Sequence, residues 1–184
     1  IQLLIEADDR DTQEALAKIT IAPPFRVVSI PVSHPRTKPK ACNVGLASAE
    51  GEFLVIYDAE DRPDPKQLKK AVIAFSRVPD NVACIQAKLS FFNSTRNLVT
   101  RCFTMEYAMW FDLCLPGLDR LRAPIPLGGT SNHFRLSVLK SLKGWDEYNV
   151  TEDCDLGLRL FVAGWRTRIL DSVTWEEACP FVPA

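Results

Sequence analysis

Short apolar runs rich in β-branched residues alternate along the chain with segments of helical periodicity, and this alternation limits the possible folds more than any other feature. It predicts an α/β sheet with crossover helices. The expected strands are residues 2–5, 25–31, 53–57, 82–86 and a later one near 167–170, with 88–93 as a further candidate. The expected helices are residues 11–19, 38–49, 65–76, 98–115 and 153–163. Asp64 should cap the third of these helices, with Pro65 as its first residue.

Length and composition fit one globular domain, residues 1–184. Of the 184 residues 47% are hydrophobic, and the formal net charge is −1, so the chain can bury a substantial core. The lack of excess positive charge argues against a nucleic-acid partner. The six cysteines show no C-x-x-C pairing, and we expect reduced thiols rather than disulfides or a zinc site. Residues 1–86 should form a nucleotide-binding half, and residues 87–184 should complete a cleft.

Two acidic clusters each follow an expected strand. One is Asp8 and Asp9, and the other is Asp58 and Glu60 within the run "VIYDAEDRPD". Because ligands of open α/β sheets bind beyond the carboxyl ends of the strands, we expect both clusters along one edge of the sheet. A D-x-[D/E] pair alone is a weak signal, since aspartates at strand ends and helix starts often cap helices or form turns.

The pair Asp58 and Glu60 has a stronger connection to a ligand, because the preceding run "FLVIY" is the most strand-like segment of the chain. Carboxylates held this close repel each other unless a cation lies between them or one is protonated. Mg²⁺ and Mn²⁺ bind to one or two carboxylates together with phosphate oxygens of a substrate. The pair therefore predicts a site for Mg²⁺ or Mn²⁺ and a diphosphate.

Four stretches together resemble the family 2 glycosyltransferases of the GT-A fold, close to the processive, membrane-anchored branch that includes cellulose synthase. The stretches are "LLIEADDRDT", "RTKPKACNVGLASAEGEFLVIYDAEDRPDP", "LGGTSNHFR" and "GWDEYNVTEDCDLGLRL". They occur in the family's order and spread over most of the chain. The resemblance implies a GT-A fold, which is a Rossmann-like mixed α/β sheet flanked by helices.

In this resemblance, Asp8 or Asp9 matches the acidic residue that holds the nucleotide base, and Lys40 matches a lysine that contacts the diphosphate. Asp58 and Glu60 match the D-x-D pair that binds the sugar nucleotide and its metal. The family usually has a second aspartate where this chain has Glu60, which leaves the choice between Mg²⁺ and Mn²⁺ open. From the residues alone, the basic run "RTKPK" that contains Lys40 is explained either as solvated surface or as a short loop that places cations and a helix start near a diphosphate.

The other matches concern the sugar and the acceptor. Gly129 and Thr130 match an element that lines the donor-sugar and acceptor pocket, and Asp153, in "TED", matches the catalytic base. The resemblance implies an inverting transfer from a nucleotide-sugar, a UDP-sugar, to a saccharide acceptor. Without it, the segment "NVTEDCDLGLRL" is an ordinary helix start, and for Asp155 that explanation stands.

Two other functions would use similar residues. A sugar-phosphate nucleotidyltransferase also places acids and a metal beside a diphosphate, but it generally needs a glycine-rich basic loop that the visible chain lacks. A non-catalytic nucleotide-sugar-binding domain would keep the donor site without the base. Trp145 and Trp165 are expected to pack in the core, and His133 is expected to be structural.

The chain also departs from the family's pattern. It opens at Ile1 inside an apolar run, and we expect a fragment that lacks the family's first strand and its Q-x-x-R-W element and is feeble or inactive by itself. An exposed sheet edge would let such a fragment self-associate. No apolar run approaches the length of a membrane span. We therefore expect the fragment to be soluble, and its parent protein to be anchored at the cytoplasmic face of the membrane.

Overall fold

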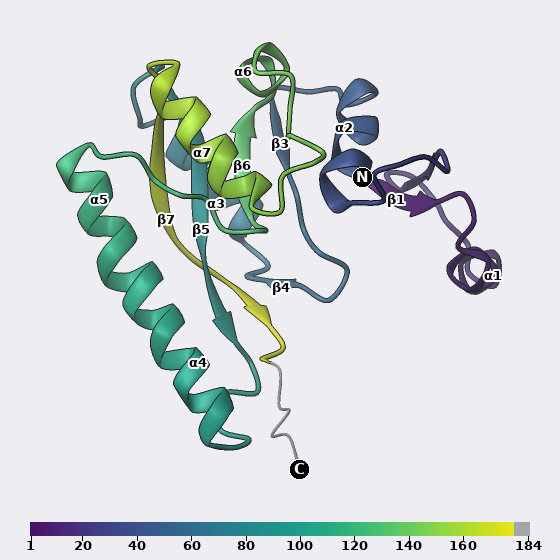
Figure 1. Cartoon of the computed structure of the whole chain (residues 1–184), viewed down its shortest axis with the longest axis horizontal. Coiled ribbons are helices and arrows are strands. Elements are labelled where there is room, and N and C mark those ends of the chain that lie inside the picture. Colours follow the sequence, from purple (N-terminus) through teal and green to yellow (C-terminus); the bar gives the residue numbers. More distant parts are fainter. Residues whose placement is uncertain (179–184) are drawn as a thin grey trace.

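The computed structural model describes residues 1–178, in which helices and strands alternate as the sequence predicts (Figure 1). In chain order the elements are β1 (Gln2–Glu6), α1 (Arg10–Ala17), β2 (Arg26–Ile30), α2 (Lys38–Ala47), β3 (Phe53–Val55), β4 (Arg62–Pro63), α3 (Gln67–Phe75), β5 (Val82–Phe91), α4 (Leu98–Ala108), the π-helix η1 (Met109–Cys114), α5 (Leu115–Leu121), β6 (Asn132–Arg135), α6 (Leu136–Ser141), α7 (Glu152–Val162) and β7 (Arg166–Glu176).

Five strands form a mixed sheet in the order β3-β6-β5-β7-β4. β5 and β7 run parallel, whereas β6 lies antiparallel to both β3 and β5, and β4 lies antiparallel to β7. β5 is central and almost wholly buried, and its first four residues, Val82 to Ile85, are all apolar, as expected for a strand covered on both faces. The predicted α/β sheet flanked by helices is therefore confirmed.

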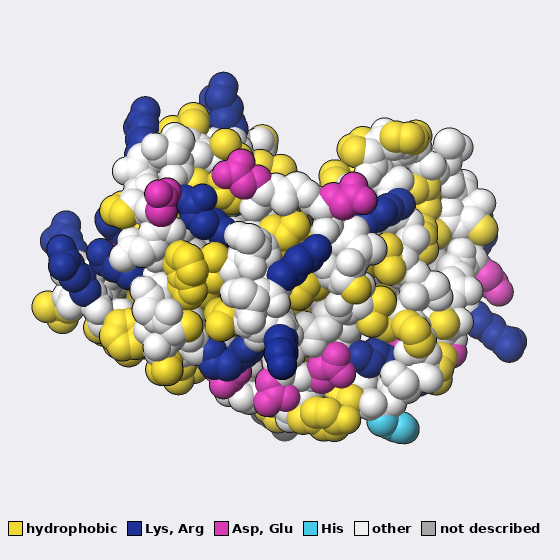
Figure 2. Space-filling model, turned by 90° about the horizontal axis from the view of Figure 1, so that it is seen from above, with side chains coloured by type: hydrophobic (Ala, Val, Ile, Leu, Met, Phe, Trp, Pro, Cys, Tyr) yellow, Lys and Arg dark blue, Asp and Glu magenta, His cyan; other side chains and the backbone are white. Residues whose placement is uncertain are grey.

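The strands β1 and β2 form a separate two-stranded parallel sheet. The expectation that both acidic clusters lie along one sheet edge is therefore wrong, because β1 and β3 belong to different sheets. Within residues 1–178, β1 pairs only with β2 and β3 only with β6, so each strand has one edge without a strand partner. The surface is hollowed between the lobe that carries β1 and α1 and the rest of the chain (Figure 2). Self-association through a sheet edge stays a prediction.

Two local expectations are corrected. Residues 88–93 do not add a strand, because β5 continues without a break to Phe91. The helix α3 begins at Gln67, so Asp64 does not cap it and Pro65 lies in a preceding turn. Instead, the Asp64 carboxylate accepts hydrogen bonds from the Lys66 backbone N–H (2.8 Å) and from the Lys70 ammonium (2.5 Å).

The helix predicted for residues 98–115 is confirmed and extends to Leu121 as α4, η1 and α5, which form one long rod at the side of the sheet (Figure 1). Pro116 lies at the start of α5 and has no N–H to donate to the preceding turn. The Leu115 N–H bonds to the Trp110 carbonyl, five residues earlier, which is the π-helical pattern. No helix within the described part of the chain is long and apolar enough to cross a membrane.

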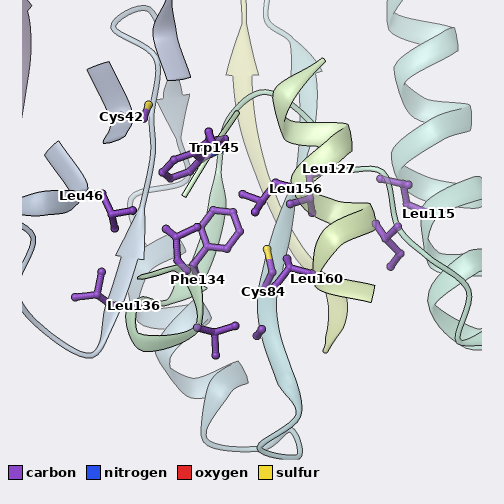
Figure 3. Packing of buried hydrophobic residues seen from close by; sticks show 14 of the residues in the cluster. Cys42, Leu46, Cys84, Leu115, Leu127, Phe134, Leu136, Trp145, Leu156 and Leu160 are labelled. Atoms are coloured by element: carbon purple, nitrogen blue, oxygen red, sulfur yellow. The ribbon is translucent and has the colours of Figure 1, made fainter. Parts of the chain in front are cut away.

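The main core lies between the five-stranded sheet and α7. Phe134 on β6, Cys84 on β5 and Leu156 on α7 point toward one another there (Figure 3). The rings of Trp145 and Phe134 pack nearly at right angles, with ring centroids 5.8 Å apart. The prediction that Trp145 is a packing residue is thus confirmed, and this core fixes the loop between α6 and α7.

Candidate active site

The acidic run after β3 forms a tight turn. The Asp61 N–H donates to the Asp58 carbonyl (3.1 Å), and the Asp58 N–H donates to Asp61 Oδ2 (2.8 Å). Burial raises the pKa of Asp61, against the hydrogen bonds from Thr130 and Asp58 that lower it. These bonds turn the Asp61 carboxylate inward and leave the side chain of Asp58, which is about one-third exposed, at the surface.

Residues 128–130 lie beside this turn although they are far away in the sequence. The Thr130 hydroxyl donates to Asp61 Oδ2, and its oxygen lies 3.3 Å from the Ile56 carbonyl oxygen. The Gln86 amide holds both ends of the segment, because it accepts from the Gly128 N–H (2.8 Å) and donates to the Thr130 carbonyl (3.1 Å). The predicted pocket element and the predicted metal-binding turn are thereby joined.

Lys38, the first residue of α2, connects three parts of the site. Its ammonium lies 2.5 Å from Asp58 Oδ1 and donates to the Gly129 carbonyl, also at 2.5 Å. Burial lowers the pKa of Lys38, but the hydrogen bond and negative charge of Asp58 outweigh burial and the pKa is raised. Lys38 is therefore a fixed positive charge at the site.

Asp153 completes the site at the first turn of α7. The side chain is buried, and a Cβ placed on Gly129 would lie 3.7 Å from its Oδ2 atom, so Asp153 borders the same segment that Lys38 contacts. Burial and the neighbouring Glu152 carboxylate raise the pKa of Asp153 to about 6, whereas Lys38 and a hydrogen bond from Trp145 lower it. At neutral pH such a group is mostly ionised and can accept a proton.

The other predicted nucleotide-binding residues lie apart from this cluster. Asp8 forms an exposed ion pair with Arg36 at 2.6 Å. Asp9 caps α1 through both carboxylate oxygens, which accept from the Thr12 N–H and hydroxyl. Of the two, Asp8 is thus the one with a carboxylate at the surface that does not serve a helix cap.

Lys40 is 4% exposed, and its ion-pair partner is Glu6 of β1 rather than Asp58. Its ammonium lies 3.1 Å from Glu6 Oε1 and donates to the Pro31 (3.0 Å) and Ser33 (3.3 Å) carbonyls. The lysine beside the turn of Asp58 and Glu60, the D-x-E turn, is therefore Lys38, two residues before the lysine that the resemblance indicates.

Three groups at the site were not found from the sequence. Lys38 and Asp61 lie inside runs that were singled out, but spacing alone does not say which members of a charged run face a site. Glu176, at the end of β7, follows the residue that pairs with Arg62. Burial and the negative charges of Asp61 and Asp58 raise its pKa to about 7. Only strand pairing brings it there, so no local signal could have identified it.

The donor atoms of this site suit a hard divalent cation. Asp58 and the exposed Glu60 supply carboxylate oxygens, and Asp61 Oδ1 is buried without a hydrogen-bond partner in the structure. No three or more His, Cys, Asp or Glu side chains within residues 1–178 are grouped so that they could hold a metal by themselves. Mg²⁺ and Mn²⁺ commonly take only one or two protein carboxylates and complete their shell with phosphate and water, so the residues present fit such an ion.

Curated proteins with similar sequences are glycosyltransferases. The chain is 24% identical over 152 residues to the probable glycosyltransferase YdaM of Bacillus subtilis, covering 82% of this chain and 36% of that protein. It is 30% identical over 129 residues to the probable glucomannan 4-beta-mannosyltransferase 1 of Arabidopsis thaliana, covering 70% and 23%. The chain thus spans about a third or less of the length of these relatives.

Solved structures with the same fold include TarS 1–349 of S. aureus, with a TM-score of 0.63 at 17% identity, covering 92% of this chain and 48% of that one. The mannosyltransferase PcManGT of Pyrobaculum calidifontis, solved with GDP-Man and Mn²⁺, gives a TM-score of 0.65 at 18% identity, covering 93% and 43%. The expected GT-A fold is thereby confirmed.

The sequence profile of the family described as Glycosyl transferase family group 2 matches residues 53–183, which include the D-x-E turn, the Gly-Gly-Thr segment and Asp153. The chain therefore belongs to family 2 of the glycosyltransferases.

Proposed function

We propose that the chain carries the site of an inverting glycosyltransferase that moves a sugar from a UDP-sugar to a hydroxyl of a saccharide acceptor. One observation carries the proposal: Lys38 contacts both Asp58 and the Gly129 carbonyl, and Gly129 borders Asp153. The groups expected to bind the diphosphate and the group expected to accept the proton thus border one short segment. This arrangement supports both halves of a transfer reaction.

In this proposal Asp58 and Glu60 would hold Mg²⁺ or Mn²⁺, which would supply positive charge beside the departing diphosphate. Lys38 adds a positive charge beside Asp58, and Asp8 contacts the nucleotide base. Asp153 accepts the proton of the acceptor hydroxyl on the face of the sugar opposite the leaving group. Attack from that face inverts the sugar carbon, by analogy with inverting glycosidases.

The names of similar proteins support a nucleotide-sugar donor and a polysaccharide product. PcManGT was solved with GDP-Man and Mn²⁺, and a relative that shares 30% of its aligned residues with the chain is a probable glucomannan mannosyltransferase. The name of PcManGT adds GDP to the UDP that the family resemblance implies, so there are two nucleotides to compare. We keep UDP as the proposed donor nucleotide and make GDP an outcome of the test.

Calorimetric titration of the protein with UDP and with GDP, each with Mg²⁺, with Mn²⁺ and with EDTA, tests the donor site. We expect metal-dependent binding of UDP, and at least a roughly tenfold loss of affinity in Glu60→Ala, equivalent to about 1.4 kcal/mol. The remaining binding should no longer respond to the metal. Glu50→Ala removes an exposed carboxylate away from the turn and should bind as the wild type does. Binding that is equal with EDTA and with metal would contradict the metal site.

We also propose that the rod formed by α4, η1 and α5 lies against a lipid surface. Five apolar side chains along the rod are 56% to 78% exposed, namely Leu98, Met105, Met109, Leu113 and Leu121. Exposed Arg101 and Arg120 lie near its two ends. A long apolar stripe with flanking positive charge is typical of helices that lie on anionic membranes.

Flotation with vesicles of neutral and anionic phospholipids tests this surface. The double variant Met105→Glu/Met109→Glu should lose at least roughly tenfold in vesicle binding, because carboxylates are repelled by both the hydrocarbon and the anionic headgroups. The matched control Leu68→Glu/Val72→Glu adds the same charge on exposed positions of α3 and should float with the vesicles as the wild type does. Equal losses in both variants would contradict a specific membrane face.

A further inference from the structure

Asp153 has a hydrogen-bond partner in the core residue Trp145. The indole Nε1–H of Trp145 donates to Asp153 Oδ1 at 3.1 Å. Trp145 is 4% exposed, and its ring packs nearly at right angles to the ring of Phe134 in the main core. Packing therefore holds the donor atom in place (Figure 3).

Asn43 fixes the backbone of Trp145 from the helix that also carries Lys38. Its side-chain amide donates to the Trp145 carbonyl (2.9 Å), and its Oδ1 accepts from the Trp145 N–H (3.0 Å). Gly144 has φ = 69° and lies so close that a Cβ there would be 2.3 Å from Asn43 Oδ1. Only glycine allows both this conformation and this approach.

We infer that Trp145 is the positioning residue of the base. The indole N–H of Trp145 holds Asp153 Oδ1, and Asn43 anchors the backbone of Trp145 to α2, the helix that carries Lys38. The inference rests on the proposed function. With Oδ1 engaged, Oδ2 is the oxygen that borders Gly129, and it is the atom that takes the acceptor proton. As that proton moves to Oδ2, the acceptor oxygen forms its bond to the sugar carbon and the bond from that carbon to the diphosphate breaks.

A hydrogen bond to a carboxylate is strongest when the carboxylate is charged, so the indole N–H should report the ionisation of Asp153. In ¹H–¹⁵N spectra of the wild-type protein recorded from pH 4 to 8, we expect the Trp145 indole resonance to shift with a midpoint near that of Asp153. The shift should disappear in Asp153→Asn. The Trp165 indole, which has no hydrogen bond to a carboxylate in the described structure, is the internal control. A Trp145 indole resonance that does not move between pH 4 and 8 would overturn the inference, whether or not the protein transfers sugar.

The variant Trp145→Phe keeps an aromatic ring and removes the donor. We expect the acid limb of its pH–rate profile to move to higher pH by about one unit, the size expected for one hydrogen bond to a charged group. A residue that serves packing alone would lower the rate without moving the limb, and that result would also overturn the inference. If the wild type binds no donor nucleotide, the proposed function fails, and the indole titration still decides the inference.

Discussion

Replacing Asp153 by Asn should slow sugar transfer by about 10²- to 10⁴-fold, the range expected for loss of a general base, while the affinity for the donor nucleotide stays close to wild type. Asn has the shape of Asp but cannot take up the acceptor proton. The measurement is kcat for transfer alongside the calorimetric Kd of UDP. Asp155→Asn is the matched control, because Asp155 lies on the same helix and pairs with Arg159 at 2.7 Å.

The same substitution separates the proposed transferase from a domain that only binds nucleotide-sugar. If Asp153→Asn retains both binding and transfer, Asp153 is not the base. In the wild type, transfer should fall as the pH drops below about 6, because burial raises the pKa of Asp153 to about 6 and the protonated group cannot act as a base. If Asp153→Asn keeps residual transfer, that activity should not show this acid limb.

The raised pKa of Asp153 also predicts a stability effect. An aspartate whose pKa rises from 3.8 to about 6 on folding binds its proton more tightly in the folded state. The charged form therefore destabilises the fold increasingly as the pH rises between these two values. Asp153→Asn should accordingly have a free energy of unfolding about 2 to 3 kcal/mol higher than that of the wild type at pH 8, measured by denaturant unfolding. The difference should vanish near pH 4.

Much of this site could be predicted from the sequence, because its strongest signals are local. A strand that runs directly into carboxylates places Asp58 at the surface whatever the rest of the fold does. Asp153 was indicated by the family resemblance alone, because the "TED" segment by itself is explained as an ordinary helix start. The long rod was predicted because its apolar residues recur over many turns, and periodicity survives small changes such as the π-helical turn before Pro116.

The parts that were missed depend on long-range pairing. The strand β6 is only four residues long and contains no β-branched residue, so no local pattern marks it. It exists because β3 and β5 bond to its two edges. The separation of β1 from β3 into different sheets likewise depends on which strands share hydrogen bonds. The alternation of apolar runs along the sequence does not determine that pairing.

The two lysines of "RTKPK" show the same limit at the level of a single helix. Positions i and i+2 of a helix do not face the same side, so once α2 begins at Lys38 the two ammonium groups diverge. One faces Asp58 and the other faces Glu6. Which lysine faces Asp58 is therefore decided by how α2 packs on β1.

Lys38→Met and Lys40→Met should have opposite consequences. Lys38→Met should lower kcat/KM for transfer by about 10²-fold, by analogy with removal of one charge-stabilising donor, and should barely change stability, because its pair with Asp58 is more than a third exposed on both sides. Lys40→Met should destabilise the fold by about 2 to 3 kcal/mol, because it leaves the Glu6 carboxylate and two carbonyls without their donor. Urea unfolding and steady-state transfer assays on both variants test these expectations.

The opposite outcome would contradict the proposed role of Lys38. If Lys40→Met unfolds like the wild type and loses UDP affinity, while Lys38→Met transfers normally, the diphosphate contact belongs to Lys40, as the family resemblance implies.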